Sequence, residues 1–471
     1  MFEAAESNSW DDAEKIAYMA FELYENGQMT LALMQLEEAM EINPNNSAWY
    51  FNAGLTLDAL DRFDDAIEAY HKALELSGED PEVLNSLAVD YTRIGKYDLA
   101  ISTFEHIQQL DPEFEPCFCN RIITYTEMDK HDKAEEMFYL AQQINPDCPI
   151  CFYNIGNSLF SRQQYKRAIW CWEQTAMLEP THPQINYRIA QALWADGNIE
   201  AAHQHFLEEL RNNPGDTDII LDFGMFLLEC GDIEGAKEKF NRIIELNPES
   251  ASAVFYLGEV MLNKSDTNRA KELFMLALEL NPNFSGPRYR LGQIALAEDN
   301  PDRALQYLQV ECELEPADTD VLFSMGLIFL QLNDFDYATN CFLRIVDADA
   351  ENAEAFYYLG TTLAIQREYE GALQFLEHAV SLGYDDPEAL ADAAYVYLRT
   401  KRLSLAAETI ADARSVSPGN KKVASVYRKV RIAAFVRHIK KYFFIDQFFQ
   451  NIRTLPTRYK RRLMRFLKTG R

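Results

Sequence analysis

An alanine recurs at every 34th residue of this 471-residue chain, twelve times in succession and without an insertion or a deletion. The positions are Ala32, Ala66, Ala100, Ala134, Ala168, Ala202, Ala236, Ala270, Ala304, Ala338, Ala372 and Ala406. A fixed period of this length is typical of arrays in which each repeat packs only on its neighbours. The period therefore predicts a helical solenoid, whose function is to be sought on its surfaces rather than in a catalytic pocket.

Other residue types keep the same register. Twelve residues after the alanine, nine of the twelve repeats have a proline, which ends one helix and begins a turn. Twelve residues before it stands Gly or Ala, with Ile122 as the exception, and four residues after it stands a large apolar side chain. Small residues allow two helices to approach closely, and the large side chains fill the space beyond that contact. Each repeat is therefore predicted to be a helical hairpin, and the chain to be all-α.

This arrangement resembles the tetratricopeptide repeat family. In the register of that family the repeats begin at Ala13, Ser47, Pro81, Glu115, Pro149, Pro183, Thr217, Ala251, Ser285, Thr319, Ala353 and Pro387, and they cover residues 13–420. The resemblance implies a right-handed superhelical solenoid of twelve 34-residue helical hairpins, in which the first helix of each hairpin lines a concave groove. It also implies a role in binding other proteins. Residues 1–12 are expected to be a lead-in, residues 421–441 a capping helix and residues 442–471 a basic amphipathic tail.

Charge is distributed unevenly along the chain. From Lys421 to the end there are sixteen Lys or Arg residues and one acid, Asp446, whereas the preceding part has 28 basic and 73 acidic residues. The net charges of the two parts are therefore +15 and −45. Because the summed field of a protein attracts partners of opposite sign, the acidic repeats are expected to attract basic ligands and to repel nucleic acid.

The sequence also predicts a compartment and excludes a class of function. The N-terminus has neither a basic region nor an apolar run of signal-peptide length, and the eight cysteines have no disulfide-framework spacing. A cytoplasmic protein is expected. No phosphate-binding glycine loop, zinc-protease motif or nucleophile elbow is present, so we expect no enzyme activity and no cofactor.

Four cysteines near the junction of the fourth and fifth repeats are candidates for a metal site. Cys117 and Cys119 are two residues apart on a predicted helix and point nearly opposite ways, while Cys148 and Cys151 cross the repeat junction. Four thiolates must converge on a structural zinc ion, so the spacing favours buried packing residues over a zinc site. No metal site is predicted.

Aromatic residues occupy the fifth position of consecutive repeats, which in the family faces the groove. The chain has Tyr153, Tyr187, Leu221, Phe255, Tyr289, Phe323 and Tyr357 there. The second position, which flanks this stripe, carries acids, among them Asp218, Asp320 and Glu354, and never a lysine. Members of the family that bind the C-terminal carboxylate of chaperones use Lys and Asn at such positions, and the missing lysines argue against that ligand. Two interpretations of the rings stay open, contact with a ligand and packing between neighbouring first helices.

Beyond Leu455-Pro456-Thr457, apolar residues alternate with basic ones in the pattern of a basic amphipathic helix. Its expected contact residues are Arg458, Lys460, Arg461, Arg462, Arg465 and Phe466. Three interpretations compete for this tail: docking on a protein partner or on the acidic repeats of its own chain, adsorption to an anionic membrane surface, and binding of nucleic acid.

The sequence therefore predicts a cytoplasmic, non-enzymatic scaffold that binds apolar or basic partner segments in an acidic, aromatic groove. The alternative is a peripheral membrane adaptor tethered by its basic C-terminal helix.

Overall fold

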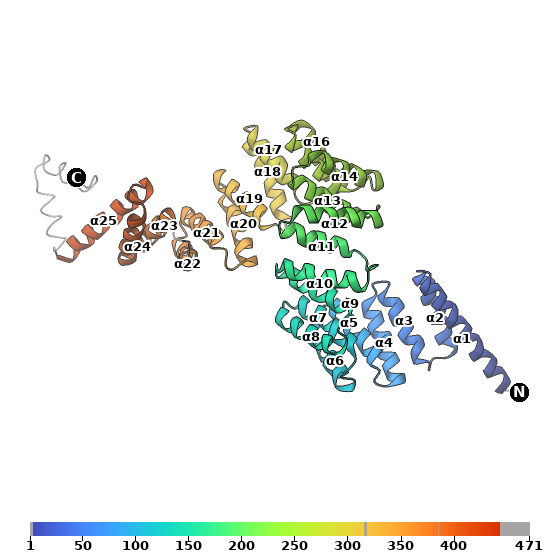
Figure 1. The fold of residues 1–471 in the computed structure, drawn as a ribbon. Helices are drawn as coiled ribbons and strands as arrows, with labels where there is room; N and C mark the ends of the chain where they lie inside the picture. The colour runs from blue at the N-terminus through green and yellow to red at the C-terminus, as the bar shows by residue number, and fades with distance from the viewer. Residues whose placement is uncertain (1–2, 315–317, 385, 443–471) are drawn as a thin grey trace, which may run out of the picture. The chain divides into compact units, whose positions relative to one another are not determined.

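The structure is a computed structural model that describes residues 3–314, 318–384 and 386–442. Within these residues it contains 25 α-helices joined by short turns and no β-strand. Figure 1 draws helices and their connections over these residues. The contacts divide the chain into two units, residues 1–239 and 240–471, with the boundary inside helix α14. The all-α prediction is confirmed.

Helices alternate between the first and the second member of each hairpin. The first helices are α1 (Glu3–Glu25), α3 (Ser47–Asp58), α5 (Pro81–Arg93), α7 (Glu115–Glu127), α9 (Pro149–Ser161), α11 (Ile185–Ala195), α13 (Thr217–Glu229), α15 (Ala251–Asn263), α17 (Pro287–Ala297), α19 (Thr319–Gln331), α21 (Ala353–Gln366) and α23 (Pro387–Arg399). The second helices are α2 (Met29–Ile42), α4 (Phe63–Ser77), α6 (Tyr97–Leu110), α8 (His131–Ile144), α10 (Tyr165–Leu178), α12 (Ile199–Asn212), α14 (Ile233–Leu246), α16 (Thr267–Leu280), α18 (Pro301–Glu313), α20 (Phe335–Ala348), α22 (Tyr369–Ser381) and α24 (Leu403–Val416). Helix α25 (Lys421–Tyr442) follows the last hairpin.

The ends of the helices follow from local sequence. Several first helices begin after a polar residue whose side chain accepts a hydrogen bond from the backbone of the first turn, as Asp216 does for α13 and Asp318 for α19. Eight of the second helices end two residues before the repeat proline. Asn281, which precedes Pro282, leaves the helical region with φ −139° and ψ 99° because a following proline disfavours α geometry.

The interior of each hairpin is built around the periodic alanine. All twelve alanines are 0% exposed, and the large side chain four residues later is at most 8% exposed in every repeat. A Cβ built on Gly326 would lie 2.7 Å from Cζ of Phe342, and one on Gly258 would lie 2.5 Å from Cε1 of Phe274. The sequence suggested that the small residue on the first helix faces the alanine of the second helix. The structure shows that it also leaves the space that the large side chain occupies.

Helix α25 covers the last hairpin of the second unit. Val423, Val426 and Val430 are buried against a cluster that includes Leu390 and Ile410. An apolar stripe of this kind can cover the open end of a repeat array.

Candidate functional site

The six aromatic residues predicted to line the groove are only partly accessible. Tyr153, Tyr187, Phe255, Phe323 and Tyr357 are half-buried, and Tyr289 is buried. Each ring that is half-buried makes contacts within its own unit. The centroid of the Tyr153 ring is 4.5 Å from that of His182, and Phe323 is 5.3 Å from Tyr358. Packing thus occupies part of each ring, and the remaining edges are what a ligand would contact.

In the first unit the hydroxyl of Tyr187 is held by polar partners. It donates a hydrogen bond to Oδ2 of Asp222 at 2.7 Å and accepts one from Nε2 of Gln191 at 2.7 Å. Burial, and then the hydrogen bond to Asp222, raise the pKa of Tyr187. Tyr187 therefore remains a neutral donor that ties helix α11 to helix α13.

The same link recurs in the second unit with a different third partner. Tyr357 donates to Oδ2 of Asp392 at 3.0 Å, and the same oxygen accepts a hydrogen bond from Nζ of Lys422 at 2.6 Å. Burial, and then the charge of Asp392, raise the pKa of Tyr357. Sequence reasoning missed both aspartates, although each lies 35 residues after its tyrosine, a separation that joins neighbouring first helices of the array.

The three predicted acids lie at the starts of first helices. Asp218, Asp320 and Glu354 are exposed in the first turns of α13, α19 and α21. A carboxylate there interacts favourably with the helix dipole, which gives these residues a structural role. Their exposure also makes them accessible to a cationic partner.

A cleft of about 660 Å³ opens on the first-helix side of the second unit, next to α25. Its lining includes the aromatic residues Tyr357, Tyr358, Tyr369 and Tyr395, one acid, Asp392, and three basic residues, Arg367, Arg399 and Lys422. Three cations face one carboxylate here. This end of the predicted groove is therefore not acidic, because the last two hairpins contribute Arg367 and Arg399 and α25 adds Lys422.

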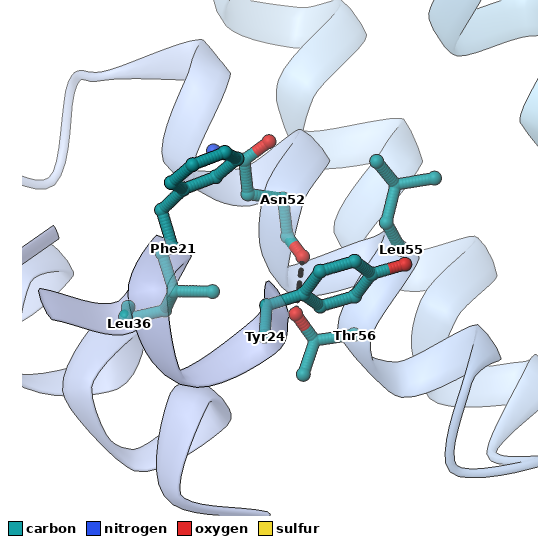
Figure 2. Close-up of a pocket in the computed structure, with 7 residues that line it drawn as sticks. Phe21, Tyr24, Leu36, Asn52, Leu55 and Thr56 are labelled. Atoms are coloured by element: carbon teal, nitrogen blue, oxygen red, sulfur yellow. Dashed lines mark hydrogen bonds between the residues drawn. The ribbon is translucent and has the colours of Figure 1, made fainter. Parts of the chain in front are cut away.

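A smaller cavity of about 90 Å³ lies between the first helices at the other end of the chain. Figure 2 shows Phe21 and Tyr24 of α1 facing Asn52, Leu55 and Thr56 of α3. The Thr56 hydroxyl donates a hydrogen bond to the Asn52 carbonyl at 2.7 Å, which ties its polar group to its own helix. The cavity is too small for a peptide and suits a single side chain.

Two buried glutamates were not anticipated from the sequence. Glu209 and Glu311 occupy equivalent positions of the sixth and ninth repeats and are 3% and 0% exposed. Glu209 accepts a hydrogen bond from the backbone N–H of Tyr187 at 3.2 Å, and Glu311 accepts one from the Ser285 hydroxyl at 2.9 Å. Both carboxylates thus bind the start of a first helix, and in these two repeats that helix has 11 residues. The sequence contained a signal for these two residues, because most other repeats have a small or aliphatic residue at the equivalent position.

The four cysteines that the sequence offers as a candidate zinc site separate into two groups. Cys117 is buried, and its thiol donates to the carbonyl of Phe104 at 3.3 Å. Cys119, Cys148 and Cys151 come together with Glu115, and Cys119 and Cys151 form a disulfide. Cys117 and Cys119 thus lie in different groups, as expected from their spacing on the helix. The spacing did not indicate that a disulfide and a carboxylate belong to the cluster.

The predicted tail residues Arg458, Lys460, Arg461, Arg462, Arg465 and Phe466 lie outside the described residues. Among the helices that the structure describes, none has the length and apolar character needed to cross a membrane.

Comparison with solved structures finds other repeat proteins at low identity. The Cut9 and Hcn1 hetero-tetramer of the APC/C matches with 16% identity over 89% of this chain and 96% of that chain, with a TM-score of 0.35. The thermophilic repeat protein TTC0263 from Thermus thermophilus matches with 21% identity over 39% of this chain and 99% of that chain, with a TM-score of 0.36. A repeat protein from Parabacteroides merdae matches with 16% identity over 57% of this chain and 99% of that chain, with a TM-score of 0.42. No curated protein sequence matches.

Family models match the chain in several places. The tetratricopeptide repeat model matches residues 20–81, 51–113 and 323–383, and the model for YpiA-like, C-terminal tetratricopeptide repeats matches residues 183–250. The last range begins and ends where the sixth repeat begins and the seventh ends in the register set by the alanines. Both units consist of helical hairpins in that register, and every periodic alanine in them is buried. The chain is a tetratricopeptide repeat protein.

Proposed function

We propose that this protein is a non-enzymatic scaffold that binds basic and apolar segments of partner proteins along its first helices. Its fold is that of a protein-interaction scaffold, and the proposal adds the class of partner. The observation that supports it most is that Asp218, Asp320 and Glu354 are exposed. Each of these acids lies on a first helix that also has half-buried apolar or aromatic residues. Carboxylates attract cations, and ring edges and faces accept apolar and cationic groups.

In the second unit two successive hairpins carry both features, and of the two rings Tyr357 also lines the cleft with Arg367, Arg399 and Lys422, so Phe323 is the better candidate for contact with a basic segment. Asp320 begins α19, which presents Phe323, and Glu354 begins α21, which presents Tyr357. In each case the acid and the ring are three residues apart on one helix and therefore lie on the same side. A partner segment with alternating basic and apolar residues fits this arrangement.

Binding of labelled short peptides to the full chain tests the proposal. A peptide of alternating Lys and Leu is compared with one of alternating Glu and Leu by fluorescence anisotropy at low and high salt. We expect the basic peptide to bind, and the triple variant Asp218→Asn, Asp320→Asn and Glu354→Gln to weaken binding roughly threefold to tenfold, since each exposed charge contributes modestly.

A matched control separates the first-helix acids from total charge. The variant Asp98→Asn, Glu200→Gln and Asp302→Asn removes three exposed acids from the first turns of second helices α6, α12 and α18. It should leave binding nearly unchanged. Equal weakening by both variants would mean that the peptide senses only the net charge, and tight binding of the acidic peptide would contradict the proposal.

A second candidate is a peripheral membrane adaptor. Its support is the far end of α25, where Ile432, Phe435 and Val436 are 38%, 49% and 38% exposed beside the exposed residues Arg431 and Arg437. Apolar and basic side chains together favour adsorption to an anionic bilayer. Flotation of the full chain with phosphatidylserine vesicles, against a chain that ends at residue 420, tests it: loss of flotation in the shorter chain supports the adaptor, and absence of flotation in both rejects it.

A further inference from the structure

Four side chains with metal-binding atoms converge at the junction of the fourth and fifth repeats, inside the first unit. They are Glu115 and Cys119 of α7, Cys148 at the start of α9 and Cys151 in its first turn. Their ligand atoms all lie within 4.8 Å of one another, and the three cysteines are at most 5% exposed. Nothing in the scaffold proposal uses this cluster.

The distances match the requirements of a tetrahedral zinc site. With a Zn–S bond of ~2.3 Å, two thiolates on one ion are about 3.8 Å apart. The sulfurs of Cys119 and Cys148 are 3.6 Å apart, and Oε1 of Glu115 is 3.1 Å from the sulfur of Cys151. Cys119 and Cys151 are joined as a disulfide in the structure. Reduction of this bond frees both sulfurs to rotate apart, so that four ligands surround one point.

We propose that the reduced protein binds one Zn²⁺ ion through Cys119, Cys148, Cys151 and Glu115, and that the Cys119–Cys151 disulfide is the metal-free, oxidised form of the same site. Three thiolates and a carboxylate are a donor set that zinc accepts, and softer thiolate ligands favour it over Mg²⁺ or Ca²⁺. A filled site would join the first helices of two successive hairpins.

Local electrostatics supports the anionic ligands. Glu115 is the first residue of α7, and Cys148 is the residue that precedes α9, so the positive ends of two helix dipoles are directed at the cluster. The backbone N–H of Cys151 donates to the sulfur of Cys148 at 3.3 Å. Because a thiol must lose its proton to bind zinc, zinc binding releases protons and weakens as the pH falls.

The chain contains two internal controls. Cys117 is also buried and lies on α7, but its thiol donates to the Phe104 carbonyl, away from the cluster. In the second unit Cys312 and Cys341 have sulfurs 3.6 Å apart, as close as those of Cys119 and Cys148. The charge of Arg344 acts on both of these thiols, and a cation beside them disfavours a metal ion.

The change from the zinc form to the disulfide form can be balanced. An azo oxidant such as diamide takes two electrons from the thiolates of Cys119 and Cys151 and two protons from solvent, and becomes a hydrazine. The two sulfurs form their bond. The zinc ion leaves as Zn²⁺ with its oxidation state unchanged, and Cys148 takes up a proton.

The test measures zinc in the full chain after reduction, incubation with zinc sulfate and gel filtration. Mass spectrometry of the metal should find about one zinc per wild-type chain, and Co²⁺ in its place should show the thiolate-to-metal absorption of a tetrahedral site. Cys148→Ser should lose the metal yet keep its fold, since serine is a good residue at the start of a helix. Cys117→Ser and Cys312→Ser should retain it.

Diamide provides an independent readout. It should release the zinc from the wild-type chain while peptide mapping finds the Cys119–Cys151 disulfide. The proposal is overturned if the reduced wild-type chain retains no more zinc than Cys148→Ser, if Cys117→Ser loses zinc to the same extent, or if the disulfide forms without releasing the metal. Circular dichroism of each variant shows whether it is folded, and Cys151→Ser repeats the test should Cys148→Ser unfold.

Discussion

Phe342 and Phe323 belong to the same hairpin, and their ring centroids are 5.7 Å apart, yet their surroundings differ. Phe342 is 0% exposed and lies against Gly326, whereas Phe323 is half-buried on α19 and contacts Tyr358 of the next first helix. The first type of position is filled by one large buried side chain in every repeat. The second holds Tyr, Leu or Phe in the fifth to eleventh repeats, and its contacts change from repeat to repeat. Every hairpin therefore has a similar interior space to fill with one large side chain. The surface of the first helices instead depends on which residues of the next repeat lie against it.

Removing the two rings separately tests this difference most strongly. Phe342→Ala should lower the free energy of unfolding by ~3–5 kcal/mol, because it leaves a cavity around a wholly buried ring. Phe323→Ala should cost about 1–2 kcal/mol, since part of its ring already contacts water. Urea denaturation of the full chain measures both, and similar losses would contradict the distinction between the two regions.

A buried charge should give the interior a pH dependence that the surface lacks. Asp90 is 1% exposed, and burial raises its pKa from 3.8 to about 7. As the pH rises from 4 to 7 the unfolded chain loses this proton and the folded chain keeps it, so Asp90 makes stability fall through this window and remain low above it.

The variant Asp90→Asn should therefore be more stable than wild type at pH 8, on the order of 2–4 kcal/mol, and close to wild type at pH 4. The nearby guanidinium of Arg93, 3.7 Å from Oδ1 of Asp90, also pairs with Asp58. Urea midpoints at the two pH values measure the effect, with the exposed Asp98→Asn as control. A variant that gains nothing at pH 8 would show that Arg93 fully compensates the buried carboxylate.

The close contact between Gly326 and Phe342 predicts an unusual response to alanine. In most helices Gly→Ala stabilises by ~1 kcal/mol, but a Cβ on Gly326 would lie 2.7 Å from a ring that cannot move. Overpacking costs ~1–3 kcal/mol, so a net loss of about 1–2 kcal/mol is expected. Gly371→Ala in α22, where the nearest atom to the new Cβ is Cδ1 of Leu363 at 3.8 Å, is the matched control. Stabilisation by Gly326→Ala in thermal melts would refute the packing argument.

The smallest effects are expected at the two tyrosine–aspartate links. Tyr357→Phe removes the hydrogen bond to Asp392, worth ~1 kcal/mol, whereas Tyr187→Phe removes both the bond to Asp222 and the bond that Gln191 donates. The loss should be larger by a few tenths for Tyr187→Phe, because Asp222 then keeps only Gln191, whereas Asp392 keeps Lys422. Thermal melts measure both, and equal losses would mean that the third partner is irrelevant.

Much of the fold could be predicted from spacing along the chain. The hairpins, their register and the burial of each alanine follow from a strict period, because a hairpin repeats the same local contacts in every copy. How much of each aromatic ring is covered could not be predicted, since it depends on residues such as His182 for Tyr153 and Tyr358 for Phe323.

By itself, then, the sequence determined a twelve-hairpin, all-α chain with an acidic array and a basic end. The tertiary structure decided which side chains meet between hairpins. Stacking of first helices places residues about one repeat apart in contact, such as Tyr187 with Asp222 and Cys119 with Cys151. Spacing within one helix cannot show this, because these contacts depend on how far each helix is shifted and rotated against the next. The sequence named the cysteines near Cys148 as candidates, but only the packing of α7 against α9 shows that three of them converge with Glu115.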